Sequence, residues 1–207
     1  MSPVDSRVNS RVDSRVNSRV NIVLMGPPGS GKGTQAVRIA AALGCAHLST
    51  GDLLRAEITA GTPLGKAVAS VVSAGELIPD DMVSELVLPR ARAAAATTGY
   101  LLDGYPRSLP QARALLDSEI PPDRVIALDA PAPELVERIL RRARLEGRAD
   151  DTPDVIEHRL RVFAESTRPV LDLFAERGLL CTVAAMGPPD TVASSILDQL
   201  PRKDRLR

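Results

Sequence analysis

The sequence predicts an α/β protein with a five-stranded parallel sheet that carries helices on both faces. Five short apolar segments alternate with longer segments of helical periodicity, which is the pattern of strands joined by crossover helices. The first apolar segment runs directly into a glycine-rich turn and then into a helix. Ligands of such a sheet bind at the carboxyl ends of its strands. The strands are expected at residues 22–25, 46–48, 100–103, 124–129 and 179–183.

Helical segments are expected between these strands, and cap or breaker residues mark several of their ends. Ser49 to Asp52 offer N-cap side chains for the helix that follows them. Pro89 should kink one helix, and Pro169 should break another, because proline lacks the backbone N–H that a helix interior needs. The expected helices cover residues 34–43, 53–60, 64–74, 78–96, 133–144, 153–175 and 191–200.

Length favours one domain over residues 20–200, preceded by a repeat and followed by a short tail at 201–207. From Asp5 to Arg19 the chain alternates VDSR and VNSR, with one valine in every four residues. Such a segment buries too little apolar surface to offset the entropy of ordering, so residues 1–19 are expected to be disordered. The repeat could be a functional tail or an upstream extension of a protein that begins near Val20, and we favour the extension.

Composition excludes several classes of function. The formal net charge is zero and aromatic residues make up only 2%, which argues against a dedicated nucleic-acid binder. No apolar run approaches the ~20 residues of a membrane span, and no signal peptide opens the chain. Cys45 and Cys181 have no metal-ligand spacing and are expected to be free thiols in a reducing cytoplasm. His47 and His158 are expected to be core or surface residues without a catalytic role.

Residues 22–35, IVLMGPPGSGKGTQ, predict a phosphate-binding loop between a buried strand and a helix. Glycines allow backbone N–H groups to close on phosphate oxygens, the helix N-terminus adds partial positive charge, and Lys32 supplies a full charge. Gly33 stands where Ser or Thr is usual, and the hydroxyl follows at Thr34. A glycine-rich surface turn is the alternative, but strand, turn and helix all fall where the motif requires. The loop predicts the P-loop nucleotide-binding fold, with ATP contacts from Gly29, Ser30, Gly31, Lys32, Gly33 and Thr34.

Three further motifs accompany the loop: LSTGDLLR at 48–55, LLDGYPRS at 101–108 with Gln111 after it, and GRADD at 147–151. Taken together, the four motifs resemble adenylate kinase, and the resemblance covers Val20 to about Leu200. It implies a phosphotransferase that moves the ATP γ-phosphoryl group reversibly to AMP, giving two ADP, for adenine nucleotide homeostasis and purine salvage. It also implies a monomer in the cytoplasm, without nucleic-acid or membrane partners.

The resemblance assigns the arginines to phosphate groups. A phosphate monoester is already largely ionised at pH 7, so the acceptor needs no general base, and the task is to bring two polyanions together. Arg55 and Arg107 are expected on the AMP phosphate, and Arg138 against the donor adenine, with a backbone contact at Gly187. The residues expected to act in catalysis are Lys32, Arg107, Arg142, Arg148 and Arg159. Of these, Arg142, Arg148 and Arg159 are expected to close on the ATP phosphates and the transferring group, and Arg148 and Arg159 are also expected near AMP.

Recognition of the AMP base and ribose phosphate is expected from a second group of residues. Thr50 and the amide of Gln111 are expected to select adenine. A surface glutamine is the alternative for Gln111. The remaining AMP contacts implied by the resemblance come from Glu76, Leu77, Ile78, Gly104, Tyr105 and Pro106.

One metal is expected, Mg²⁺ bound with ATP. Asp103 ends a buried strand and is expected to reach the metal through water, because Gly33 lacks the usual hydroxyl ligand; a helix cap or structural ion pair is the alternative. The resemblance divides the domain into a core, an NMP-binding insertion at 49–78 and a lid at 141–152. Only five residues separate Arg142 from Arg148, without a cysteine, so we expect a short lid without zinc.

Three other functions remain open at this stage. The chain could be a kinase for UMP, CMP or another monophosphate, which an assay of different acceptors would decide. A kinase for an alcohol would need a base near the acceptor, and the arginines of the two central motifs argue against it. A module that senses ATP and AMP without turnover is excluded if ADP forms.

Overall fold

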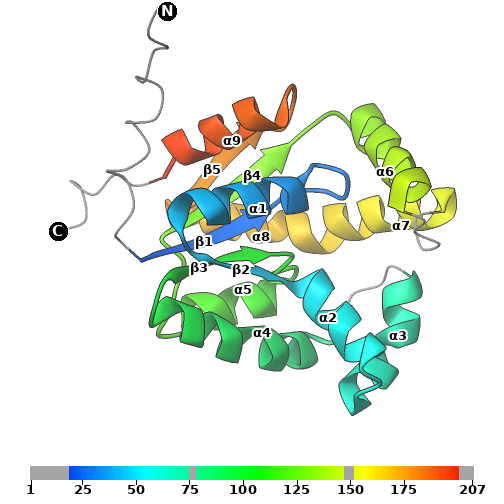
Figure 1. Ribbon diagram of the computed structural model, residues 1–207, viewed down its shortest axis with the longest axis horizontal. Coiled ribbons are helices and arrows are strands. Elements are labelled where there is room, and N and C mark those ends of the chain that lie inside the picture. The colour runs from blue at the N-terminus through cyan, green and yellow to red at the C-terminus, as the bar shows by residue number, and fades with distance from the viewer. Residues whose placement is uncertain (1–18, 75–77, 147–151, 201–207) are drawn as a thin grey trace, which may run out of the picture.

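A computed structural model describes residues 19–74, 78–146 and 152–200. Within these residues, the expected parallel sheet is confirmed. Its strands are β1 (Val20–Met25), β2 (Ala46–Ser49), β3 (Gly99–Asp103), β4 (Arg124–Asp129) and β5 (Leu180–Ala184), in the order β2-β3-β1-β4-β5 (Figure 1). Residues 1–18 of the repeat expected at 1–19 and the tail at 201–207 lie outside the described residues.

The register of the sheet places the chemically important strand ends at one edge. Leu24 of β1 pairs with Asp103 of β3, and Ser49 of β2 pairs with the same aspartate. The inner residues of β1, β3 and β4 are almost inaccessible to solvent, as the continuous apolar sequence of a parallel strand predicts. The segments that leave β1, β2 and β3 therefore start side by side at the carboxyl edge.

Helices cover both faces of the sheet (Figure 1). On one face lie α1 (Lys32–Leu43) and α9 (Pro189–Asp198), which pack Ile39 and Ile196 against the apolar strand residues. On the other face lie α4 (Asp80–Ala95), α5 (Leu109–Leu116) and α8 (Arg168–Glu176). Each helix buries one apolar face, so the sheet has a core on both sides.

Two helix pairs project beyond the carboxyl edge of the sheet. The first is α2 (Thr50–Thr59) with α3 (Pro63–Ala74), which approach closely at Gly65: a Cβ there would lie 2.1 Å from the Glu57 carbonyl oxygen. The second is α6 (Ala132–Glu146) with α7 (Pro153–Val162). No helix of the described residues is both long and apolar enough to span a membrane.

Some helix ends are shifted by a few residues, such as the start of α2 at Thr50 in place of residue 53, and the structure differs more substantially from the expected elements in two places. Helix α5 was not expected, although Ser108 caps its first turn by accepting from the Gln111 backbone N–H at 3.4 Å. The expected break near Pro169 occurs one turn earlier, as a π-helical turn at Phe163–Thr167 between α7 and α8. There the Arg168 N–H bonds to the Phe163 carbonyl, five residues back. Proline at 169 cannot donate within a helix, which accounts for a local change in the hydrogen-bond pattern at this point.

Candidate active site

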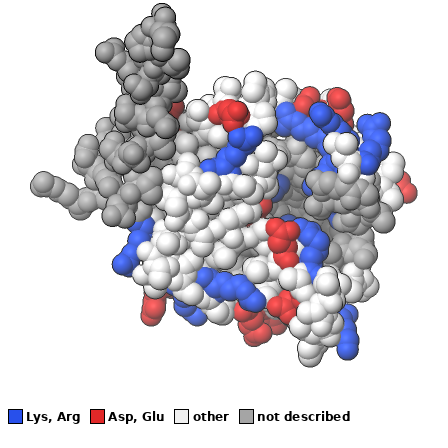
Figure 2. Space-filling view, viewed as in Figure 1, with Lys and Arg blue, Asp and Glu red and all other residues white. Residues whose placement is uncertain are grey.

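A cleft of about 950 Å³ opens at the carboxyl edge of the sheet, between the two projecting helix pairs. Figure 2 shows Lys and Arg side chains gathered around this hollow. The phosphate loop, the start of α2, the segment after β3 and helices α6 and α7 all contribute to its lining. Because these separate segments converge here, the cleft is the site at which the predicted motifs meet.

The phosphate loop has the predicted form. Strand β1 ends at Met25, the loop turns through Gly26 to Gly31, and α1 begins at Lys32. Gly29 has a φ of +81°, and a Cβ on it would lie 2.5 Å from the Leu135 carbonyl oxygen. Only glycine fits this position, because a side chain would meet both an unfavourable φ and the backbone of α6. The loop is thereby packed directly against the helix pair on the α6 side.

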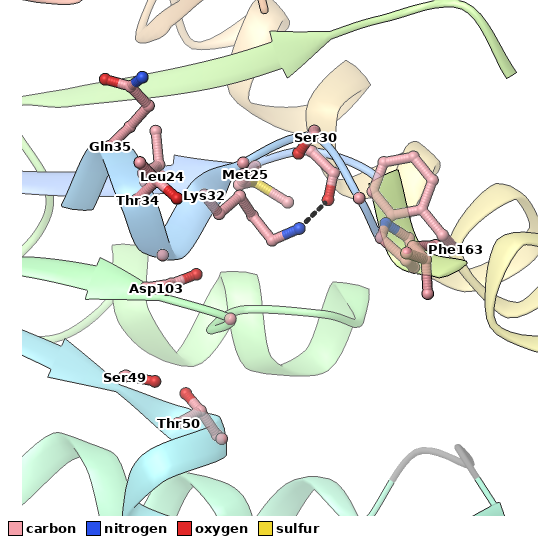
Figure 3. A pocket seen from close by; sticks show the side chains of 18 of the residues that line it. Leu24, Met25, Ser30, Lys32, Thr34, Gln35, Ser49, Thr50, Asp103 and Phe163 are labelled. Atoms are coloured by element: carbon pink, nitrogen blue, oxygen red, sulfur yellow. Dashed lines mark hydrogen bonds between the residues drawn. The ribbon is translucent and has the colours of Figure 1, made fainter. Parts of the chain in front are cut away.

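Lys32 points back over its own loop. Its ammonium group donates to the carbonyl oxygens of Gly26 at 2.8 Å and Pro27 at 2.9 Å, and Figure 3 shows one such bond as a dashed line. Burial lowers the pKa of the Lys32 amine to about 8; the Asp103 carboxylate opposes this shift, and the charges of Arg107 and Arg142 add to it. Lys32 therefore lies within electrostatic reach of both arginines.

Arginines from different segments of the cleft influence the pKa of Arg107 through their charges. Burial lowers the pKa of the Arg107 guanidinium, and the positive charges of Arg159 and Arg55 lower it further, whereas Asp103 raises it. An arginine remains protonated near pH 7 in spite of such shifts. Because like charges repel, an anion that binds between these arginines lowers the electrostatic energy of the cluster.

Two buried hydroxyl groups in the cleft lining have no hydrogen-bond partner among the described residues. They are Ser30 Oγ in the phosphate loop and Thr50 Oγ1 at the start of α2, in residues that are 2% and 3% exposed. Figure 3 shows Thr50 below the loop that carries Lys32. Buried polar groups are nearly always bonded, so unpartnered hydroxyls on a cleft wall fit contacts with a ligand.

The segment after β3 positions Arg107 and Gln111. The Gln111 side chain is 3% exposed, accepts from the Arg107 backbone N–H at 2.8 Å and donates to Asp80 Oδ1 at 2.7 Å. The Arg107 Nε donates to the Gly104 carbonyl at 2.9 Å. The Arg107 carbonyl accepts from Thr167 Oγ1 at 3.0 Å, which connects this segment to the π-helical turn.

Asp103 lies beneath the start of α1. It is 9% exposed, and a Cβ on Gly33 would lie 3.8 Å from its Oδ2 atom. His47 Nε2 of the neighbouring strand lies 3.7 Å from the same oxygen. The sequence interpretation gave His47 no role, whereas the structure places it in the cleft lining beside Asp103. The described residues contain no group of three or more potential metal ligands.

Arg138 and Gly187 both belong to the cleft lining. Arg138 donates to Glu134 at 2.7 Å and to the Ala185 carbonyl at 2.8 Å, so its guanidinium is held against the segment after β5. Gly187 belongs to the same cleft lining and has a φ of +90°. This geometry creates a flat, charged surface beside a turn, which suits stacking against an aromatic base.

Most of the remaining predicted site residues also reach the cleft. Its lining includes Gly31, Gly33, Thr34, Arg55, Ile78, Gly104, Pro106, Arg142 and Arg159. Tyr105 is different: its side chain is buried away from the cleft, and its hydroxyl contacts Ser84 at 3.0 Å and the Gln111 carbonyl at 3.4 Å. Glu76, Leu77 and Arg148 lie outside the described residues.

The sequence interpretation missed several contributors to the site. His47, Phe163 and Thr167 line the cleft, and Asp80 supports Gln111 from behind. His47 directly precedes the LSTGDLLR motif, which was the only local signal for it. The other three have no motif of their own, and only the tertiary structure brings them to the site.

One cleft brings a glycine-rich phosphate loop together with arginines from several segments, which suits the binding of two phosphate-bearing ligands. Fold and cleft together therefore define a phosphotransferase of the P-loop nucleotide-binding class. The sequence profile of the family described as Adenylate kinase matches residues 24–179. An adenylate kinase of Stenotrophomonas maltophilia (strain R551-3) is 47% identical over 180 residues, which cover 85% of this chain and 96% of the relative. An adenylate kinase of Xanthomonas oryzae pv. oryzae (strain MAFF 311018) is 46% identical over 185 residues, 87% of this chain and 99% of the relative.

The chain therefore belongs to the adenylate kinase family. It is a phosphotransferase, and its reaction is the transfer of a phosphoryl group from ATP to AMP. The resemblance inferred from the four motifs is thereby confirmed, as is the P-loop fold.

Proposed function

We propose that the chain carries out this transfer reversibly and with Mg²⁺, and that it thereby balances ATP, ADP and AMP. The observation that carries the proposal is that one cleft brings the phosphate loop with Lys32 together with Arg107 and Arg142 from two other segments. Burial is the main cause of the lowered pKa of Lys32, and the charges of the two arginines add to it. Cations that repel one another at this range are stabilised by polyanions bound between them. Two nucleotides with their phosphates end to end provide such an anion.

The donor ATP is assigned to the phosphate loop and to the Arg138 end of the cleft. Gly29 to Thr34 would surround the β- and γ-phosphates with backbone N–H groups and the Lys32 charge. The donor adenine would lie between Arg138 and Gly187. The supporting observation is that one continuous cleft joins these residues to the loop.

The acceptor AMP is assigned to the opposite wall. Arg55 and Arg107 would hold its phosphate, and Thr50, Ile78 and Gln111 would contact its base. The unpartnered Thr50 hydroxyl and the low exposure of Gln111 in the cleft lining support this placement. The backbone contacts expected at Glu76 and Leu77, outside the described residues, remain part of the proposal.

The chemistry would be positioning combined with charge stabilisation. The acceptor phosphate is ionised at neutral pH, so no side chain has to remove a proton. Lys32, Arg107, Arg142 and Arg159 would stabilise the charge of the transferring phosphoryl group and hold donor and acceptor in line. Arg148, outside the described residues, is proposed to join them when the site closes.

The residues present fit a Mg²⁺ ion that arrives with ATP. Magnesium in nucleotide sites keeps several waters and takes one or two carboxylates together with substrate phosphates. Asp103 supplies one carboxylate below the phosphate loop. Its Oδ2 atom lies close to the start of α1, since a Cβ on Gly33 would be 3.8 Å from it. When bound, the metal would neutralise phosphate charge, and Asp103 would hold its water shell. We propose no zinc site.

We also propose that the two projecting helix pairs close on the substrates, with an NMP-binding insertion at 49–78 and a lid at 141–152. Closure excludes water, which would otherwise hydrolyse ATP. Amide hydrogen exchange tests the division: two adenosines joined by five phosphates should slow exchange in both segments, whereas AMP alone should slow it mainly in 49–78. Equal protection of both segments by AMP would contradict a separate lid. Arg148→Ala should lower turnover strongly with little change in AMP affinity.

A coupled assay of ADP formation with AMP, CMP, UMP and GMP as acceptors tests the substrate assignment. AMP should be the best acceptor by a wide margin. A preference for CMP or UMP would place the chain among pyrimidine monophosphate kinases. We propose that the protein acts as a monomer in the cytoplasm, which sedimentation and fractionation would test.

A further inference from the structure

The amide of Gln111 is held in one of its two possible orientations. Its Oε1 atom accepts from the backbone N–H of Arg107 at 2.8 Å, and its Nε2 atom donates to Asp80 Oδ1 at 2.7 Å. A backbone N–H can only donate, and a carboxylate oxygen can only accept. If the amide rotated by half a turn, a donor would face a donor and an acceptor would face an acceptor. The two partners therefore dictate the orientation.

Asp80 is itself fixed in place. The same Oδ1 atom accepts a second hydrogen bond from Ser108 Oγ at 2.7 Å. Asp80 begins α4 and Ser108 caps α5, so the carboxylate connects two helices that pack on the same face of the sheet. Asp80 does not belong to the cleft lining, whereas Gln111 does. The aspartate thus acts on the cleft from behind, through the Gln111 side chain and through the Ser108 cap of α5.

The fixed amide leaves one lone pair on Oε1 and one N–H on Nε2 for a ligand. This pair complements an adenine edge, where the 6-amino group donates and N1 accepts. Hypoxanthine and guanine present the reverse pattern, with an oxygen that accepts at C6 and an N1–H that donates. A base of this kind would pair well only with a rotated amide, and Asp80 and the Arg107 N–H both oppose that rotation.

We propose that Asp80 is a specificity-determining positioning residue: it fixes the Gln111 amide so that the acceptor site selects bases with an amino group over bases with an oxo group at the paired position. The inference rests on the proposed role of Gln111 as the reader of the acceptor base. It also divides the selection between two residues. Cytosine shares the amino-and-acceptor edge of adenine, so Asp80 does not exclude CMP, and that exclusion falls to the Thr50 side of the cleft.

The test compares AMP with IMP, which differ only at the edge that Gln111 would read. Asp80→Asn keeps the size of the side chain, but an amide can present either an oxygen or an N–H to Gln111. The ratio of kcat/KM for AMP over IMP should fall by about tenfold, the effect of one hydrogen bond, mainly because IMP becomes a better acceptor. The AMP-to-CMP ratio should stay unchanged.

Asp81→Asn is the matched control, because it removes the same charge from the neighbouring, exposed residue of α4. It should leave the AMP-to-IMP ratio as it is. Asp80→Ser, whose hydroxyl can donate or accept, is a second variant with the same expected result, should Asp80→Asn fail to fold. A loss of activity with AMP and IMP in equal proportion in the Asp80 variants would overturn the proposal.

Gln111→Leu separates this inference from the proposed function on which it rests. If the AMP-to-IMP ratio is unchanged in Gln111→Leu, Gln111 does not read the base and the proposed acceptor pocket is wrong. If the ratio falls in Gln111→Leu but not in the Asp80 variants, Gln111 reads the base without help from Asp80, and the inference alone is wrong.

Discussion

The ammonium group of Lys32 donates a hydrogen bond of 2.8 Å to the carbonyl oxygen of Gly26, six residues earlier in the phosphate loop. A bound phosphate would compete with this carbonyl for the same protons. The pKa of Lys32 is about 8 because of burial. Above this pH the amine loses the proton that it would donate to a phosphate. Phosphate charge favours the protonated amine, so binding of ATP raises this pKa. ATP binding should therefore take up a proton at pH 8 and above, and ATP affinity should fall as pH rises beyond about 8.

Titration calorimetry in buffers of different ionisation enthalpy measures this proton uptake directly. Lys32→Met is the control: it should abolish the uptake and lower turnover by several orders of magnitude, because the transferring group loses a fixed cation. Uptake that persists in Lys32→Met would assign the proton to another group.

Thr50→Ala should relax discrimination against CMP, and to a smaller extent against UMP, whose oxo edge the fixed Gln111 amide still opposes, more than it weakens ATP binding. The Thr50 hydroxyl is buried in the cleft wall without a protein partner, so its removal should not lower the melting temperature. Relative kcat/KM values for AMP, CMP and UMP provide the measurement. Thr50→Ser retains the hydroxyl and should behave like the wild type; an unchanged acceptor profile in Thr50→Ala would remove Thr50 from the base pocket.

Gly65→Ala should push α3 away from α2, because a Cβ at this position would lie 2.1 Å from the Glu57 carbonyl oxygen. Overpacking against backbone costs about 1–3 kcal/mol. The free energy of unfolding should fall by that amount, and AMP affinity should weaken more than ATP affinity, since α2 begins at the acceptor wall. Ala67→Ser, at an exposed position of the same helix, should change neither quantity. Wild-type stability in Gly65→Ala would show that the two helices separate at little cost.

Arg138→Ala should raise the KM for ATP with little effect on the KM for AMP. Its guanidinium is held by Glu134 and by the Ala185 carbonyl, on α6 and after β5, whereas Thr50 begins α2. Initial rates at varied ATP and at varied AMP separate the two constants. A selective rise in the KM for AMP would reverse our assignment of the two ends of the cleft.

The sequence alone predicts the sheet and the phosphate loop because both depend on local patterns. Gly26 to Lys32 follow a fixed spacing, and each strand is a short apolar run bounded by turn residues. The Asp80–Gln111 contact could not be predicted in this way. It joins residues 31 positions apart, and it depends on how α4 and α5 pack together.

Motif membership also assigned Tyr105 to the AMP site together with its neighbours. In the structure only Gly104 and Pro106 of this trio line the cleft, while the Tyr105 side chain fills the core. A motif shows that a segment is at a site, but the direction of each side chain follows from the local backbone. His47 is the opposite case: the pairing of Ser49 with Asp103 in the sheet brings its ring toward Asp103, and a single sequence does not reveal strand pairing.

The hydrogen bond from Thr167 to the Arg107 carbonyl fixes one end of the helical segment formed by α7 and the π-helical turn. From Thr167 back to Pro153 the helical segment extends about 20 Å. A rotation of about 20° around the fastened end would carry the Pro153 end through about 7 Å, as follows from the same helix length. A small change in the angle of this segment at Thr167 would therefore produce a large displacement at the Pro153 end of α7. Removing the Thr167 hydroxyl would loosen the pivot and would also release the Arg107 carbonyl that it holds.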